Sequence, residues 1–270
     1  MIRSALYMPG ANERALEKAK SIPADALILD LEDAVAPDAK PAARERVCAL
    51  VADRAYGERT VAIRVNAPGT PWHEADLQAA LEAGPSAVLV PKVESPQTVR
   101  DIPGETPIWA MLETPTAVLC SAQIAAADER LTMLVLGTND LANELHAESV
   151  PGRAPLLTGI GLALLGARAA GKLILDGVYN DVKDAAGFEA ECLQGRQFGF
   201  DGKTLIHPSQ VEPCNRVFSP SAEQIAESQE ILAAWEEATA DGRGVATVRG
   251  RLVENLHVEN AKRILARAKA

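Results

Sequence analysis

Cysteine and histidine are scarce in this sequence, and neither is spaced for a metal site. The four cysteines lie far apart and form no C-x-x-C pair, which argues against a disulfide framework or a zinc knuckle and fits a reducing compartment. No pair among the four histidines has the spacing of zinc ligands, so a zinc hydrolase is disfavoured. The first residues enter a strand-like segment without a signal-peptide pattern. We therefore expect a cytoplasmic protein.

Long apolar runs and an excess of positive charge are also missing. No apolar run approaches the roughly 20 residues that a membrane-spanning helix needs. The formal net charge of −10 opposes nucleic-acid binding through a general basic field, but it leaves room for a local basic patch that holds a phosphorylated cofactor. We expect small-molecule partners, with no membrane and no nucleic acid.

What the sequence does contain is a regular alternation of short apolar runs and longer amphipathic stretches, which is typical of β–α units. The expected strands are residues 4–8, 26–31, 60–65, 87–90, 107–112, 133–136, 172–175 and 203–206. Helical patterns between them include residues 13–20, 40–52, 74–83, 116–127, 160–170 and 187–198. Eight such units predict an α/β fold, a (β/α)₈ TIM barrel over residues 1–219. A doubly wound sheet is the alternative, but no G-x-G-x-x-G follows the first strand.

Residues 220–270 lie outside the eight units. They contain a long helical pattern at residues 222–239, a glycine-containing loop, a short strand-like segment at 246–248, and a final helix from about residue 257. We expect this C-terminal helical extension to cap the mouth of its own barrel or of a neighbouring subunit's barrel.

Acidic side chains follow several of the expected strands. Catalytic residues in such barrels lie at the carboxyl ends of the strands, and Glu113 and Asp140 each end an apolar run. Two converging carboxylates repel unless a cation lies between them, and oxygen ligands without histidine or cysteine favour Mg²⁺ or Mn²⁺ over zinc. Glu32 and Asp33 are placed to hold the waters of such a metal. Alternatively, Glu113 and Asp140 cap the helices that follow them, or the rim is merely polar.

Two basic features point to anionic ligands. Arg64 ends an apolar strand, where an arginine is costly to bury without an anionic partner; its fork suits a carboxylate or a developing enolate oxygen. A rim salt bridge to Glu32 or Asp33 is the alternative. Arg14 and Lys18 lie one turn apart on the first expected helix, whose amino end could hold phosphates, although such residues are usually a solvated helix face.

An ordered set of motifs resembles the citrate lyase β-subunit-like family, which includes malyl-CoA and citramalyl-CoA lyases within the 2-keto acid aldolase group. The motifs span almost the whole chain and are Leu6-Tyr7-Met8-Pro9-Gly10, Leu29-Asp30-Leu31-Glu32-Asp33-Ala34-Val35-Ala36-Pro37, Ile63-Arg64-Val65-Asn66, Val90-Pro91-Lys92-Val93, Leu112-Glu113-Thr114, Leu136-Gly137-Thr138-Asn139-Asp140-Leu141 and Ile206-His207-Pro208-Ser209-Gln210-Val211.

The resemblance implies a barrel that assembles as a homotrimer or hexamer and binds magnesium. The positions that match the family's metal ligands are Glu113 and Asp140, with Glu32 and Asp33 behind the metal waters. Arg64 matches the arginine that contacts the keto acid and enolate oxygens, and the segment that contacts coenzyme A holds Lys18, Arg14 and Tyr7.

The tail departs from the family pattern at one position. A family motif of the type Gly-x-x-Val-Asp supplies an acidic catalytic residue from a neighbouring subunit, whereas this chain reads Gly250-Arg251-Leu252-Val253-Glu254. Glu254 keeps the carboxylate but is one methylene longer, and a misplacement of about 1 Å can cost on the order of 10²-fold in rate. The chemistry of this chain is therefore either adapted to Glu254 or altered.

These features predict a magnesium-dependent carbon–carbon lyase. It would cleave a small 3-hydroxyacyl-CoA, of the malyl-CoA or citramalyl-CoA type, into acetyl-CoA and glyoxylate or pyruvate, or catalyse the reverse condensation. Arg64 would stabilise the enolate, and Glu254 would protonate its carbon. The alternatives are a malyl-CoA-type thioesterase, a citrate lyase β subunit that acts on an acyl-carrier-protein thioester, and a barrel that binds CoA thioesters or keto acids without turnover.

Overall fold

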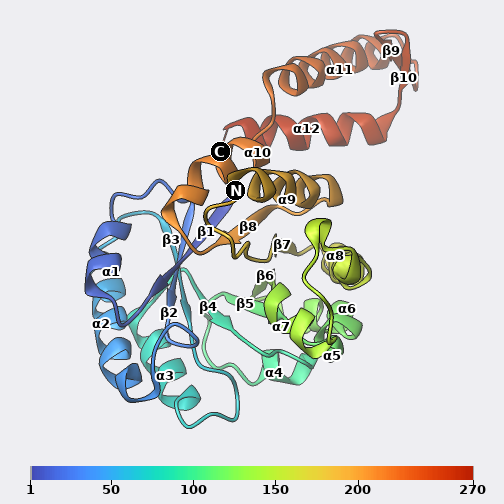
Figure 1. Cartoon of the computed structure of the whole chain (residues 1–270). Helices are drawn as coiled ribbons and strands as arrows, with labels where there is room; N and C mark the ends of the chain where they lie inside the picture. The colour runs from blue at the N-terminus through green and yellow to red at the C-terminus, as the bar shows by residue number, and fades with distance from the viewer. Residues whose placement is uncertain (1, 270) are drawn as a thin grey trace. The chain divides into compact units, whose positions relative to one another are not determined.

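The computed structural model describes residues 2–269 and contains a closed barrel of eight parallel strands, in the order β1 to β8 (Figure 1). The strands are β1 Ser4–Pro9, β2 Ala26–Asp30, β3 Thr60–Arg64, β4 Ala87–Val90, β5 Ile108–Leu112, β6 Leu131–Leu136, β7 Leu173–Asp176 and β8 Gly202–Leu205. Each predicted strand agrees with an observed one to within two residues at either end. The prediction of a TIM barrel is therefore confirmed.

Helices surround the strands of the barrel (Figure 1). They are α1 Glu13–Ala19, α2 Lys40–Ala52, α3 His73–Ala83, α4 Pro96–Arg100, α5 Pro115–Leu119, α6 Ser121–Ala125, α7 Thr138–Glu144, α8 Leu157–Ala169, α9 Ala185–Phe198 and α10 Val211–Phe218, with 3-10 turns η1 Pro37–Ala39, η2 Pro151–Leu156 and η3 Pro208–Gln210. The sequence pattern did not predict the short helices α4 and α10, and it offered a helix near α7 only in the alternative in which Asp140 is a helix cap.

The predicted continuous helix over residues 116–127 is wrong, because the chain breaks at Cys120 into α5 and α6. At this break the backbone of α8 comes very close to α6: a Cβ at Gly166 would overlap the side chain of Ser121. The Ser121 hydroxyl also donates a hydrogen bond of 3.2 Å to the carbonyl of Leu162. Tertiary packing therefore sets the break, and an apolar period along one segment does not reveal it.

Side chains fill the interior of the barrel. Small residues on the first four strands, Ala5, Ala26, Ala62 and Ala87, share one buried cluster with the large side chains of Trp109, Met111 and Met133 on β5 and β6. The small residues leave space for the large ones, so the centre is a packed core and not a pore. A ligand can enter only above this core, at the ends of the strands.

The chain forms two compact units, Ile2–Arg216 and the segment from Val217 onward. The second unit contains α11 Ala222–Ala240, an antiparallel pair of strands (β9 Ala246–Val248 and β10 Arg251–Val253) and α12 Asn255–Lys269. Ala238, Val253 and Val258 form its buried centre with Trp235 packed against them. β10 was not predicted, and α12 begins two residues earlier than expected. That this unit caps a barrel mouth stays a prediction.

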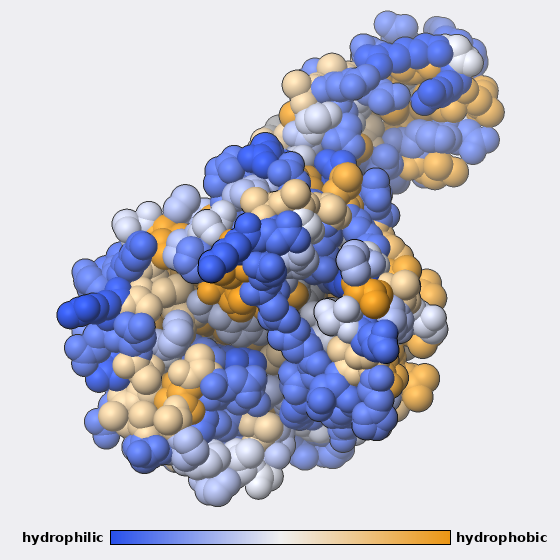
Figure 2. All heavy atoms as spheres, viewed as in Figure 1, coloured by the Kyte–Doolittle hydropathy of each residue, from blue (hydrophilic) through white to orange (hydrophobic). Residues whose placement is uncertain are grey.

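Hydrophilic side chains cover most of the visible surface of both units (Figure 2). In the part of the chain that the structure describes, no helix is both long enough and apolar enough to cross a bilayer.

Candidate active site

A cavity of about 340 Å³ opens at the carboxyl ends of the barrel strands. Its walls come from nearly every part of the barrel, and the polar side chains among them include Tyr7, Asp30, Asp33, Arg64, Thr138, Asn139, Asp140 and Thr204. The predicted site residues on β1, β3 and the loops after β2 and β6 thus meet in one place. The cavity is where barrel enzymes carry their chemistry.

Arg64 on β3 is buried and is held in a fixed orientation by Asp30 on β2. Its Nε and Nη2 atoms donate hydrogen bonds of 2.7 Å to the two carboxylate oxygens of Asp30. Asp30 also accepts hydrogen bonds from the backbone amides of Glu32 and Ala34, at 2.9 and 3.1 Å. Burial alone would lower the pKa of Arg64, but the neighbouring carboxylate of Asp30 raises it above its ordinary value. The guanidinium is therefore a permanent, oriented positive charge.

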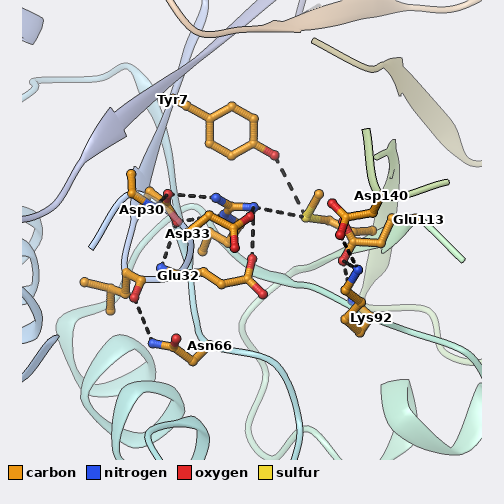
Figure 3. Close-up of polar contacts among 12 residues, drawn as sticks. Tyr7, Asp30, Glu32, Asp33, Asn66, Lys92, Glu113 and Asp140 are labelled. Carbon is orange, nitrogen blue, oxygen red and sulfur yellow. Dashed lines mark hydrogen bonds and ion pairs between the residues drawn. The ribbon is translucent and has the colours of Figure 1, made fainter. Parts of the chain in front are cut away.

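The remaining nitrogen of Arg64 faces Glu32 and Asp33 (Figure 3). Nη1 lies 2.9 Å from Glu32 Oε2 and 3.3 Å from Asp33 Oδ2, so the salt-bridge alternative is also present. Burial raises the pKa of Glu32 to about 8, although Arg64 lowers it. The sequence pattern was not used to predict a role for Asp30. The same pattern that singled out Glu113 and Asp140, a carboxylate at the end of an apolar strand, also holds for Asp30.

Tyr7 lies on β1 against Arg64, away from the exposed face of α1 that carries Arg14 and Lys18. The Tyr7 ring centroid is 4.8 Å from the Arg64 guanidinium carbon, and its hydroxyl donates to the sulfur of Met111 at 3.9 Å. Burial raises the pKa of Tyr7 well above its ordinary value, so the hydroxyl stays neutral. The structure thus places Tyr7 at the cavity, and its predicted contact with coenzyme A stays a prediction.

Glu113 and Asp140 converge, and Lys92 joins them (Figure 3). Lys92 Nζ lies 2.6 Å from Asp140 Oδ1 and 3.9 Å from Glu113 Oε1, and the Lys92 backbone amide donates a hydrogen bond of 2.8 Å to Glu113 Oε1. Glu113 is 1% exposed, and burial raises its pKa to about 6 although Lys92 lowers it. Lys92 lies in the Val90-Pro91-Lys92-Val93 motif, which by itself indicated no role for its side chain.

Neither carboxylate caps the helix that follows it. The side chain of Thr114 caps α5 by accepting a hydrogen bond of 3.1 Å from the amide of Ala117. The residue before α7 is Gly137, so α7 has no side-chain cap. Gly137 leaves the space that Glu113 needs, since a Cβ there would lie 2.6 Å from Glu113 Oε2. The capping alternative therefore fails, and neither carboxylate is used to cap a helix.

The donor set, two carboxylates without histidine or cysteine, fits magnesium and not zinc. Among the described residues no group of three or more histidine, cysteine, aspartate and glutamate side chains forms a complete metal cage. Mg²⁺ keeps several waters and binds proteins through one or two carboxylates together with substrate oxygens. The Lys92 ammonium lies against both Glu113 and Asp140, which indicates that their electrostatic field favours a cation. Magnesium ligation by these two residues stays a prediction.

Side chains of Lys40 and Asn66 hold the backbone of the loop that carries Glu32 and Asp33. Lys40 on α2 is 5% exposed, and its Nζ donates hydrogen bonds of 2.9 and 2.8 Å to the carbonyls of Leu31 and Glu32. Asn66 donates a further hydrogen bond of 2.8 Å to the carbonyl of Leu31. These contacts fix the loop backbone, so only the side chains of Glu32 and Asp33 can change their orientation.

Five predicted site residues lie outside the cavity lining. Glu32 and Glu113 lie beside it, in contact with Arg64 and Lys92 respectively, and the other three are Arg14, Lys18 and Glu254. Arg14 and Lys18 are exposed on α1, and their side chains make no hydrogen bond or ion pair within residues 2–269. Glu254 lies between β10 and α12 in the C-terminal unit; its side chain is exposed, and its backbone amide donates to His257 Nδ1 at 3.1 Å. All three side chains are available for ligand contacts, and their roles stay predictions.

Comparisons with known proteins agree with the barrel fold. Residues 3–208 match the HpcH/HpaI aldolase/citrate lyase family, and residues 161–270 match a family described as a C-C bond lyase of the TIM-barrel fold. The chain is 50% identical to a (3S)-malyl-CoA thioesterase of Cereibacter sphaeroides strain KD131, over 99% of this chain and 95% of the relative. It is 34% identical to the citrate lyase subunit beta of Escherichia coli K12, over 98% and 93% of the two chains.

A solved structure extends this likeness to three dimensions. Protein CitE of Mycobacterium tuberculosis, in complex with magnesium, acetoacetate and coenzyme A, superposes with a TM-score of 0.83 at 32% identity, covering 99% of this chain and 98% of CitE. The match of one profile to most of the chain, together with full-length relatives above 30% identity, leads to one conclusion: this chain belongs to the HpcH/HpaI aldolase/citrate lyase family.

Proposed function

We propose that this protein is a magnesium-dependent thioesterase that hydrolyses a small 3-hydroxyacyl-CoA of the malyl-CoA type. The observation that carries the proposal is the position of Arg64 and Asp140 at one cavity, with Glu113 beside it and linked to Asp140 through Lys92. The cavity volume of about 340 Å³ lies at the small end of ligand sites, which suits the acyl end of the thioester. Relatives with 50% and 51% sequence identity are named (3S)-malyl-CoA thioesterases, which favours hydrolysis.

Glu113 and Asp140 would hold the magnesium ion through their carboxylate oxygens, and the bound ion would supply positive charge that orients the acyl group's own oxygens. Arg64 would donate a hydrogen bond to the thioester oxygen as negative charge develops on it. Asp30 binds Nε and Nη2 of this guanidinium, so Nη1 is the nitrogen that would bind the substrate, in place of its contacts with Glu32 and Asp33.

Glu254 would perform the proton transfer, because its exposed carboxylate has no partner within the described residues. In hydrolysis it would accept the proton of the water that attacks the thioester carbon, and the products would be the free hydroxy acid and CoA. Lys18 and Arg14 would hold the phosphates of CoA.

Carbon–carbon cleavage is the second candidate. The match of residues 161–270 to a C-C bond lyase family favours it. The same groups serve this reaction, since Arg64 would stabilise the enolate oxygen of acetyl-CoA and Glu254 would protonate the enolate carbon. The keto acid would be glyoxylate or pyruvate, whose single methyl difference is worth only about 1–3 kcal/mol in a pocket.

Product analysis separates the two reactions. The purified protein is incubated with malyl-CoA and with citramalyl-CoA, with magnesium and with EDTA, and the products are identified by mass. Free CoA with an intact hydroxy acid, formed only with magnesium, supports the thioesterase. Acetyl-CoA with a keto acid establishes the lyase instead, and no product from either substrate contradicts both.

Replacing Arg64 tests the site itself. Arg64→Ala should lower turnover by a factor on the order of 10²–10³, the usual effect of removing a donor to a developing oxyanion. It should also destabilise the fold by about 3–5 kcal/mol, because Asp30 is left buried without its partner. Arg64→Lys keeps the charge but not the two-pronged contact, so it should fold better and still turn over slowly.

The exposed Arg100 provides the matched control, and Arg100→Ala should leave turnover unchanged. Thermal melts of all variants separate lost chemistry from lost folding. Wild-type turnover in a folded Arg64→Lys variant would remove Arg64 from the mechanism.

A further inference from the structure

Lys92 is the residue of this site for which the proposed chemistry has no use. It lies two residues after the end of β4 and has a φ of 52°, a left-handed conformation that is uncommon for a residue other than glycine. This conformation allows one residue to make two contacts: the amide points at Glu113 Oε1 at 2.8 Å, and the ammonium reaches Asp140 Oδ1 at 2.6 Å. Backbone strain of this kind persists where surrounding contacts over-determine it, often at functional sites.

The charges around the cavity fall into two groups. Arg64 pairs with Asp30, Glu32 and Asp33. Within the described part of the chain, Lys92 is the cation that pairs with Asp140 and with Glu113. Without Lys92, two carboxylates would face each other with no positive charge between them, and one of them is buried.

We propose that Lys92 is an internal counter-ion that competes with magnesium for the Glu113–Asp140 pair. The inference rests on the proposed metal site. Magnesium requires carboxylate oxygens at about 2.0–2.1 Å, and the Lys92 ammonium already lies against Asp140 Oδ1. A divalent ion at that oxygen repels the ammonium, so one cation displaces the other.

The side chain of Lys92 can leave while its backbone stays. It is 34% exposed and consists of a flexible four-carbon stem, so the ammonium can swing into solvent or toward an anionic substrate. The amide contact to Glu113 does not depend on the side chain and holds that carboxylate in place. The metal therefore meets two carboxylates that are already close together, and it must compete with the lysine for them.

Magnesium affinity of a Lys92→Met variant tests the competition. The substitution keeps the backbone amide and the side-chain length but removes the charge. We expect calorimetry to show magnesium binding tightened on the order of tenfold or more, because a unit charge at this range contributes several kcal/mol at the effective dielectric of a protein surface. In EDTA the variant should melt about 2–4 °C below the wild type, and saturating magnesium should abolish that difference.

Two further variants complete the design. Lys92→Arg keeps the charge and should retain wild-type magnesium affinity within a few-fold, and Lys183→Met removes an exposed charge elsewhere on the barrel unit and should change neither readout. If the wild type binds magnesium and Lys92→Met binds it equally or more weakly, the counter-ion proposal is overturned while the proposed metal site stands. If the wild type binds no magnesium, the proposed metal site fails, and the competition fails with it.

Discussion

Glu113 is a buried carboxyl group whose surroundings decide its proton affinity. Burial raises its pKa to about 6, although the charge and the amide of Lys92 act in the opposite direction. The unfolded chain leaves the same group in water, with a pKa near 4.5. In the absence of metal, the folded state therefore binds this proton more tightly than the unfolded state does.

The difference predicts the sign of one pH effect on stability. A raised carboxyl pKa stabilises the fold fully below pH 4.5, and that contribution is lost as the pH rises through about 6. The loss amounts to about 2 kcal/mol in the free energy of unfolding. Urea unfolding in EDTA should thus show the wild type losing more stability than Glu113→Gln between pH 4.5 and pH 7. Parallel pH curves for the two proteins would contradict this.

The sequence correctly predicted that Arg64 needs an anionic partner, but it did not identify the main partner. An arginine inside an apolar strand needs an anion, and Arg64 has one. Its main partner is Asp30, which lies opposite Arg64 in the register of β2 and β3. The apolar pattern locates strands but does not give their register. Nor does a motif containing Lys92 reveal a positive φ, because that angle results from contacts with Glu113 and Asp140 on other loops.

At the scale of elements, strands were predictable and short helices were not. Most barrel strands are buried on both sides and appear as continuous apolar runs with turn residues at their ends; β8, which contains Lys203 and Thr204, is an exception. The helices α5 and α6 have only five residues each, and their boundaries depend on where α8 packs. The convergence of Glu113 and Asp140 followed from the barrel topology, because β5 and β6 are neighbours.

The junction of β6 and α7 predicts a second effect on stability. Gly137 immediately precedes α7 and lies beside Glu113. A Cβ at this position would lie 2.6 Å from Glu113 Oε2. Gly137→Ala should therefore cost about 1–3 kcal/mol, as overpacking usually does, and it should weaken magnesium binding by moving the carboxylate. Gly161→Ala on α8 is the control, because nothing lies within 4 Å of its added Cβ. Thermal melts and calorimetry compare the two, and equal behaviour would show that the Glu113 site tolerates the methyl group.

At the scale of the whole molecule, the proposed chemistry depends on two units. Arg64, Glu113 and Asp140 belong to the barrel unit, and Glu254 belongs to the C-terminal unit. The family resemblance places the acidic tail residue in the site of a neighbouring subunit of a homotrimer or hexamer. On this proposal the reaction would require an assembled oligomer, in which each site would contain side chains from two chains.

Subunit mixing tests this arrangement directly. Arg64→Lys and Glu254→Gln should each have little activity alone, because each lacks one group of every site. When the two variants are coexpressed with different tags, a site with an intact barrel from one chain and an intact tail from another should form in roughly a quarter of cases, as random assembly of a cyclic oligomer gives. The mixture should regain about that fraction of wild-type turnover. Arg64→Lys mixed with Glu113→Gln is the matched control, because both changes lie on the barrel and no mixed site escapes them. Activity of the first mixture no higher than the mean of its components would mean that Glu254 serves its own barrel or none.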